Sequence, residues 1–259
     1  MEENMMKKFM KIAALTLAAV MMLACFAGCG KTEDTTKVYK IASDNAFPPF
    51  EFLDAETNTY VGVDMDILAA IAEDQGFQYE VANVGFDAAL GQVQAGQADA
   101  VIAGMTITPA RAEIFDFSDG YFEDGQIMVV AAGSDIDSLD DLKGKVVATK
   151  AGTMGLEYAE ANKDAYGFTT TMFEGSVEMY QAVAQGSCVA CFEDFSVAAY
   201  AIKSGDLALK TVGEVINPAP YGFGVKKGTN AELIDMFNKG LANIKANGKY
   251  DEILAKYGM

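Results

Sequence analysis

The stretch Ala103-Gly104-Met105-Thr106-Ile107-Thr108-Pro109-Ala110-Arg111 carries most of the information about the fold. It follows an apolar strand pattern, and its Gly104 allows a ligand to approach the backbone closely. Thr108 can cap a helix that starts at Pro109. Arg111 would then lie near the free N–H groups of a helix start, a place suited to a carboxylate. On local grounds the alternative is a strand, a turn and a helix with a surface arginine.

Strand and helix patterns alternate along the chain on both sides of this stretch. In the first half, we expect strands at 38–42, 77–81 and 98–103, and helices at 64–75 and 86–95. In the second half, we expect strands at 126–132, 145–149, 168–173, 188–192, 207–212 and 221–225, and helices at 155–161, 176–185, 197–203, 231–247 and 250–257. Residues 43–52, which include two prolines, are expected to form a loop. The alternation predicts an α/β fold in which helices cover parallel sheets.

Two segments rich in glycine or proline divide this pattern into halves. The first is 120–125, and the second is 218–222, where the chain would return to the first half. Two α/β lobes that are joined by two strands enclose a cleft, and ligands of such folds bind at the carboxyl ends of the strands. We therefore expect the functional site in a cleft between the lobes.

Residues 1–28 have the pattern of a secretory signal peptide. A basic segment with Lys7, Lys8 and Lys11 precedes a short apolar run, which ends in small residues before Cys29. This order is typical of a signal peptide rather than a membrane-spanning helix. The small residues before the cysteine resemble the bacterial lipobox, so Cys29 is expected to become the lipidated first residue of a tether at 29–37. An uncleaved anchor is the alternative.

The composition argues against several classes of function. Hydrophobic residues make up 51% of the 259 residues, which predicts a folded globular body. Removing residues 1–28 takes away three lysines and two glutamates, and leaves 16 basic and 35 acidic residues, a net charge of −19. This charge disfavours nucleic acid and an anionic membrane surface as partners. Histidine, the commonest general base and metal ligand, is absent, and we expect no metal site and no cofactor.

Cys188 and Cys191 lie in an apolar segment that is expected to form a strand. Residues three apart on a strand point to opposite faces, so a disulfide between them is not expected. We expect two buried free thiols.

Five motifs, taken in order, resemble one family. They are Asp44-x-x-Phe47-x-Pro49-Phe50, Gly62-Val63-Asp64-x-Asp66, Ala103-Gly104-Met105-Thr106-Ile107-Thr108-x-x-Arg111, Asp116-Phe117-Ser118-Asp119-Gly120-Tyr121 and Asn247-Gly248-Lys249-Tyr250. The chain is similar to the extracytoplasmic solute-binding proteins of ABC importers for polar amino acids, and most similar to the glutamine-binding branch. The resemblance implies a type II periplasmic-binding-protein fold, with two α/β lobes, a two-stranded hinge and the ligand in the cleft. Lobe 1 would comprise 38–122 and 222–259, and lobe 2 would comprise 123–221.

In lobe 1, the resemblance implies seven ligand-binding residues: Asp44, Phe47, Phe86, Ala103, Gly104, Thr106 and Arg111. Phe47 and Phe86 would form aromatic walls, although core packing is the alternative for both. Ala103, Gly104 and Thr106 would supply backbone and hydroxyl contacts. Arg111 would bind the α-carboxylate, because its planar fork of donors matches a carboxylate.

In lobe 2, the resemblance implies five ligand-binding residues: Lys150, Thr153, Met154, Glu193 and Asp194. Thr153 and Met154 would contact the α-carboxylate, and Asp194 would accept hydrogen bonds from the α-ammonium. Lys150 would reach the side-chain carbonyl of glutamine, or else be a solvated lysine. Glu193 replaces a histidine of the glutamine-binding pattern, and could favour a donor-rich side chain, pair with Lys150, or be a surface charge.

The leading hypothesis is a non-enzymatic, lipid-anchored extracytoplasmic receptor at the cell membrane. It would bind a polar amino acid, glutamine in first place, by closure of the lobes, and deliver it as a monomer to an ABC permease. Another polar or basic amino acid is the alternative ligand. A dehydratase-like enzyme on the same fold would need a positioned acid or base, for which Glu193 is the candidate. A sensor subunit would need a separate signalling partner.

Overall fold

The computed structural model describes residues 37–204 and 207–259. The chain divides into two units, 1–37 and 38–259, and the described helices and strands lie in the second. The expected signal peptide at 1–28, Cys29 and the tether as far as residue 36 lie outside the described residues. In the part of the chain that is described, no helix is long and apolar enough to cross a membrane.

Lobe 1 is built on a five-stranded sheet of order β5-β1-β6-β13-β7. Its strands are β1 (Val38–Ser43), β5 (Gln78–Asn83), β6 (Ala100–Val101), β7 (Phe115–Phe117) and β13 (Gly224–Lys226). Strand β1 runs parallel to β5 and β6, whereas β13 is antiparallel to both β6 and β7. Because β13 comes from near the C-terminus, the chain leaves lobe 1 after β7 and returns to it later.

Lobe 2 is built on a second five-stranded sheet, of order β10-β9-β11-β8-β12. Its strands are β8 (Phe122–Ala131), β9 (Val146–Lys150), β10 (Thr169–Phe173), β11 (Ala190–Asp194) and β12 (Leu209–Tyr221). Strand β9 runs parallel to β10 and β11, and β8 is antiparallel to β11 and β12. The type II fold expected from the sequence is thus confirmed as two sheet-based lobes.

Helices cover both sheets. In lobe 1 they are α2 (Val63–Gln75), α3 (Phe86–Gln94), α4 (Pro109–Ala112), α8 (Ala231–Ala246) and α9 (Lys249–Lys256). In lobe 2 they are α5 (Met154–Tyr166), α6 (Ser176–Ala184), α7 (Phe195–Ser204) and the 3-10 helix η1 (Leu139–Leu142). Apolar side chains fill the space between helices and sheets, so each lobe has its own core. Cys188 and Cys191 are buried free thiols in lobe 2, as expected.

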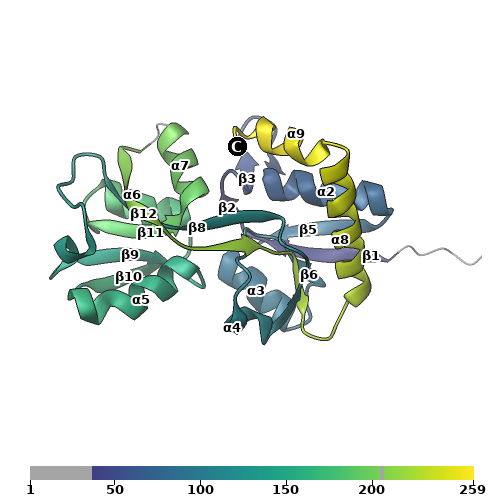
Figure 1. Ribbon diagram of the computed structural model, residues 1–259, viewed down its shortest axis with the longest axis horizontal. Helices are drawn as coiled ribbons and strands as arrows, with labels where there is room; N and C mark the ends of the chain where they lie inside the picture. The colour runs from purple at the N-terminus through teal and green to yellow at the C-terminus, as the bar shows by residue number, and fades with distance from the viewer. Residues whose placement is uncertain (1–36, 205–206) are drawn as a thin grey trace, which may run out of the picture. The chain divides into compact units, whose positions relative to one another are not determined.

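Strands β8 and β12 run side by side between the two groups of elements (Figure 1). Their pairing extends from Leu209 with Ala131, in lobe 2, to Tyr221 with Phe122 at the other end. The two strands approach closely at Gly125, where an added Cβ would lie 2.7 Å from Val215 Cγ1 and 2.8 Å from the Ile216 carbonyl oxygen. They form the two-stranded link of the fold.

Several expectations about secondary structure were wrong, among them the short strand β6, the start of β13 and the end of α5. The expected loop at 43–52 contains β2 (Ala46–Phe47) and β3 (Glu51–Asp54), which form a small sheet with β4 (Thr59–Val61). These strands have two to four residues, too few to show an alternating pattern. Strand β11 begins two residues later than expected. Strand β12 is much longer than the expected 207–212, because pairing with β8 overrides its turn-forming residues, and an edge strand tolerates proline.

The core of lobe 1 can be tested at Phe237, whose ring stacks on Phe223 with 4.5 Å between ring centroids. Both side chains are fully buried. Phe237→Ala should lower the free energy of unfolding by about 3–5 kcal/mol, because it removes buried apolar surface and leaves a cavity. Urea unfolding measures this loss. Phe195→Ala, at an exposed phenylalanine, is the matched control and should change stability by less than about 0.5 kcal/mol. Equal losses would contradict the prediction.

Candidate functional site

The structure brings all twelve predicted site residues together around one cavity. They are Asp44, Phe47, Phe86, Ala103, Gly104, Thr106, Arg111, Lys150, Thr153, Met154, Glu193 and Asp194. Several lie where strands end: Asp44 follows β1, Lys150 ends β9 and Asp194 ends β11. The carboxyl ends of strands from both sheets therefore face the same cavity, as in other open α/β sheets.

Arg111 enters the cavity from a short helix. Thr108 is the N-cap of α4, and its hydroxyl accepts a hydrogen bond from the Arg111 backbone N–H at 3.1 Å. The guanidinium donates to the Thr106 carbonyl oxygen and, from lobe 2, to the Gly152 carbonyl oxygen, both at 2.9 Å. These bonds use two of its five N–H donors, so it can still bind an anion. The surface-arginine alternative is wrong, because Arg111 is buried.

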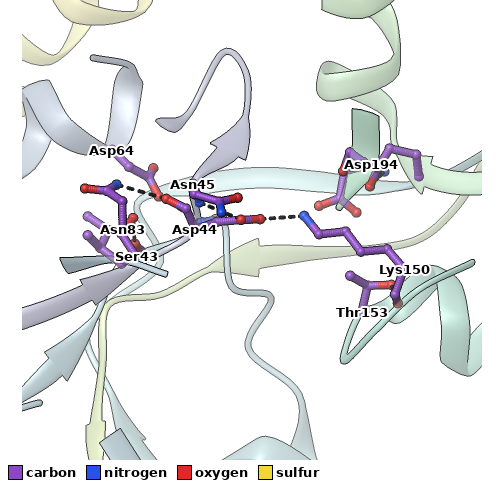
Figure 2. A network of polar contacts seen from close by, with 12 residues as sticks. Ser43, Asp44, Asn45, Asp64, Asn83, Lys150, Thr153 and Asp194 are labelled. Carbon is purple, nitrogen blue, oxygen red and sulfur yellow. Dashed lines mark hydrogen bonds and ion pairs between the residues drawn. The ribbon is translucent and has the colours of Figure 1, made fainter. Parts of the chain in front are cut away.

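Lys150 and Asp44 form an ion pair across the cavity. Lys150 Nζ lies 2.5 Å from Asp44 Oδ2, and both side chains are almost fully buried. Figure 2 shows Lys150 reaching Asp44 from the opposite side of the site. Burial alone lowers the pKa of Lys150, but the carboxylate of Asp44, followed by that of Glu193, outweighs burial and raises it. The solvated-lysine alternative is therefore wrong, and Lys150 is a cation within the cavity.

Aromatic rings form the walls of the cavity next to these cations. Lys150 Nζ lies 4.5 Å from the centroid of the Phe47 ring, and the Arg111 guanidinium lies 5.4 Å from that of Phe86. Both rings are buried, and both line the cavity. Phe86 also belongs to an apolar core cluster, as does Phe47, so each ring packs on one side and faces the cavity on the other.

Glu193 and Asp194 are buried at the end of β11. Glu193 accepts hydrogen bonds from the Ser176 hydroxyl at 2.9 Å and from the Asp194 backbone N–H at 3.1 Å. Every residue of β11 is buried, so the surface-charge alternative for Glu193 is wrong. Burial, followed by the nearby Glu193 carboxyl group, raises the pKa of Asp194 to about 7.

The sequence did not predict the residues that hydrogen-bond to Asp194 and keep it in position. The Tyr221 hydroxyl and the Gln126 amide both donate hydrogen bonds to Asp194. The Tyr221 hydroxyl also lies 3.3 Å from Asp124 in β8. Tyr221 ends β12 and therefore belongs to the two-stranded link. Tyr221 lies in the second proline-bearing segment, which could have indicated a role at the link. In the sequence alone it has the pattern of an apolar strand residue.

The site pairs fixed charges of opposite sign at separate places. Arg111 comes from lobe 1, and Asp194 comes from lobe 2, with the aromatic walls and the Lys150–Asp44 pair between the lobes. Such an arrangement suits a small ligand that carries both an anion and a cation. Because the lining residues come from both lobes, the arrangement is typical of two-lobed binding proteins.

Residues 39–259 match the model of the bacterial extracellular solute-binding proteins, family 3, and the chain belongs to this family. A probable histidine-binding protein of Neisseria gonorrhoeae is 32% identical over 97% of this chain and 96% of its own length. The ABC transporter glutamine-binding protein GlnH of Bacillus subtilis is 30% identical over 97% of each chain. Both relatives are named as binding proteins, and GlnH is named as that of an ABC transporter.

Solved structures support the same fold. An ancestral arginine-binding protein bound to glutamine has a TM-score of 0.79 and 38% identity, and covers 85% of this chain and 97% of its own. The structure of an ancestral arginine-binding protein bound to arginine has a TM-score of 0.80 and 38% identity. It covers 86% of this chain and 98% of its own. An ancestral amino acid-binding protein, a precursor of cyclohexadienyl dehydratase, has a TM-score of 0.76 and 32% identity, with coverage of 86% and 95%.

The raised pKa of Asp194 predicts a dependence of stability on pH. Between pH 3.8, the ordinary pKa of an aspartate, and about pH 7, the folded protein keeps the proton of Asp194 while the unfolded chain loses it. The stability that this group contributes is therefore fully present below about pH 4 and is lost as the pH rises through about 7. Asp194→Asn removes this loss, and at pH 8 should raise the free energy of unfolding without ligand by about 1–3 kcal/mol. Urea unfolding at pH 5 and pH 8 measures the difference. The exposed Asp135→Asn is the control, and should parallel the wild type. An unchanged pH slope in Asp194→Asn would refute the assignment.

Proposed function

We propose that this chain binds a polar amino acid, glutamine in first place, between its two lobes and delivers it to an ABC importer. Proteins of this family bind amino acids and deliver them to ABC permeases. The observation that carries the proposal is one cavity with buried Arg111 on one side and buried Asp194 on the other. The chain acts as a monomeric receptor without catalysis, so the ligand should be recovered unchanged from the protein.

The charges of the site match an amino acid, which is a zwitterion. Arg111 binds the α-carboxylate through a planar pair of N–H donors, together with Thr106 and Thr153. Asp194 accepts hydrogen bonds from the α-ammonium. Since Arg111 belongs to lobe 1 and Asp194 to lobe 2, only the closed form pairs both ends of the ligand. Binding then shifts the population towards closure.

The lobes in this proposal have the boundaries expected from the sequence. Lobe 1 comprises 38–122 and 222–259, and lobe 2 comprises 123–221. The link between β8 and β12 supports the proposal, because the chain crosses there in both directions. Hinge bending at this link would open the cavity and release the ligand.

The Lys150–Asp44 pair favours a carboxamide as the ligand's side chain. A carboxamide has a carbonyl oxygen that accepts from an ammonium and an NH₂ group that donates to a carboxylate. Glutamine could therefore insert between Lys150 and Asp44 and satisfy both. A cationic side chain would meet the buried ammonium of Lys150, which repels it. Glu193 supports this preference only indirectly, because its oxygens already accept from Ser176 and the Asp194 backbone.

Arginine is the second candidate ligand. Structures titled as ancestral arginine-binding proteins, bound to glutamine in one case and to arginine in another, are both similar to this chain. A basic ligand would need the Lys150 ammonium to leave Asp44, so that Asp44 and Glu193 could accept from the guanidinium. We rank it below glutamine because the ion pair is short and buried.

A thermal-shift measurement across the twenty amino acids tests the proposal. Glutamine at 100 times its dissociation constant should stabilise the protein by about 2.7 kcal/mol. Arg111→Ala should weaken glutamine binding by about 2–5 kcal/mol in calorimetry, because the carboxylate loses a buried partner. Arg111→Lys is the matched variant that keeps the charge but loses the planar fork, so it should recover only part of the affinity. No shift with any amino acid would refute the function, and a larger shift with arginine would reverse the ranking.

We also propose that the receptor is anchored to the outer side of the cell membrane through a lipid on Cys29. The small residues before Cys29 and the basic and apolar segments before them support this anchor. Cys29→Ser should move the protein from the membrane fraction to the soluble fraction, because stable anchoring needs more than one acyl chain and the variant has none. Cell fractionation measures this change. Labelling with a palmitate analogue should be lost as well, and membrane retention of the variant would contradict the proposal.

A further inference from the structure

Two buried carboxyl groups lie behind the cavity and are not used by the proposed ligand contacts. Glu51 begins β3, Asp64 is in the first turn of α2, and both side chains are fully buried. Among the described residues, both carboxyl oxygens of Glu51 and the Oδ1 atom of Asp64 have no hydrogen-bond donor. Three buried acceptors without donors are costly, so the arrangement needs an explanation.

The other oxygen of Asp64 is well satisfied. Asp64 Oδ2 accepts from the Gly104 backbone N–H and from the Tyr121 hydroxyl, each at 2.8 Å. The Glu51 and Asp64 carboxyl groups lie close enough together for each to affect the pKa of the other. Two ionised carboxylates cannot bond to each other, because neither has a donor. One proton between them supplies the missing donor and removes one of two buried negative charges.

The surroundings indicate which group holds this proton. Asp64 has two donors and lies at a helix N-terminus, both of which favour its ionised form. Glu51 has neither. Burial, followed by Asp64 and Asp44, raises the pKa of Glu51 well above its ordinary value of 4.5, while Lys150 opposes the shift. Burial raises the pKa of Asp64 to about 6 against its hydrogen bonds. Tyr121 and Tyr250 are the other titratable groups near the pair.

We propose that Glu51 and Asp64 share one proton, held on Glu51, and that this pair positions Gly104 and Tyr121 for ligand binding. Gly104 lines the cavity with φ of +55°, and a Cβ there would lie 2.6 Å from the Phe47 ring. Tyr121 directly precedes β8, and its backbone N–H donates to the Tyr221 carbonyl oxygen at 2.9 Å. Asp64 therefore connects the ligand-contact loop to the two-stranded link, and Glu51 keeps Asp64 in place.

The positioning role rests on the proposed function, but the shared proton does not. Figure 2 shows Asp64 on the same side of the site as Asp44, which receives Lys150 from the other side. Loss of the Glu51 proton would add a negative charge beside Asp44 and Asp64. The folded protein holds this proton above the ordinary pKa of 4.5, so stability present below pH 4.5 falls as the pH rises towards the raised value.

The experiment compares Glu51→Gln with Glu51→Met in the full mature chain. The glutamine amide keeps a donor for Asp64 and cannot ionise, whereas methionine has similar size and no donor. Without ligand, Glu51→Gln should melt about 2–4 °C above the wild type at pH 8, and the difference should vanish near pH 4.5. Infrared spectra should lose the carbonyl stretch of a buried protonated carboxyl group. Asp66→Asn, in the same helical turn but bonded to Lys256 and Tyr257, is the control and should keep the wild-type slope.

The binding arm uses glutamine as the probe at pH 7. Glu51→Met leaves Asp64 Oδ1 without a donor, and should bind roughly tenfold more weakly than Glu51→Gln. Equal affinity and equal melting temperature of the two variants would overturn the proposal, as would an unchanged pH slope in Glu51→Gln. If the wild type binds no amino acid, the proposed function fails, while the melting and infrared measurements still decide on the shared proton.

Discussion

The pairing of β8 with β12 is the interaction on which the rest of the structure depends. Both strands belong to the sheet of lobe 2, and their far ends lie beside lobe 1. There the backbone of Ile107 donates to the Pro220 carbonyl oxygen, and Gly222 donates to that of Met105. The loop that carries Thr106 is thus hydrogen-bonded to the end of the link. In the proposed function, a rotation of one lobe against the other would bend this strip, as in other proteins with hinged domains.

The cavity holds more charge than a stable core would contain. Arg111, Lys150, Asp44, Glu193 and Asp194 are all buried around it. Taking such groups out of water is unfavourable unless each finds a partner. Lys150 and Asp44 satisfy each other, whereas burial, followed by the neighbouring Glu193 carboxyl group, raises the pKa of Asp194. In the proposed function, the ammonium group of the ligand would pair with Asp194.

The sequence predicted which residues line the cavity better than it predicted the secondary structure around it. All twelve were expected to lie together, because the family resemblance assigns these positions residue by residue. The small sheet β2-β3-β4 and the length of β12 were missed, since both depend on pairing between distant segments. Tyr221 and Glu51 were missed for a related reason. Their roles arise from neighbours such as Asp194 and Asp64, and a lone tyrosine or glutamate in an apolar stretch gives no sign of them.

The position of Tyr221 affects the optical properties of the protein. The chain has no tryptophan and 11 tyrosines, so tyrosine dominates its near-ultraviolet absorbance and its intrinsic emission. The Tyr221 ring packs against Phe50 of lobe 1, with 5.1 Å between centroids, while its hydroxyl donates to Asp194 of lobe 2. A bond from a phenol to a carboxylate alters both the absorbance and the emission of the ring. The protein thus carries its own chromophore at the junction of lobes and link, readable without an added dye.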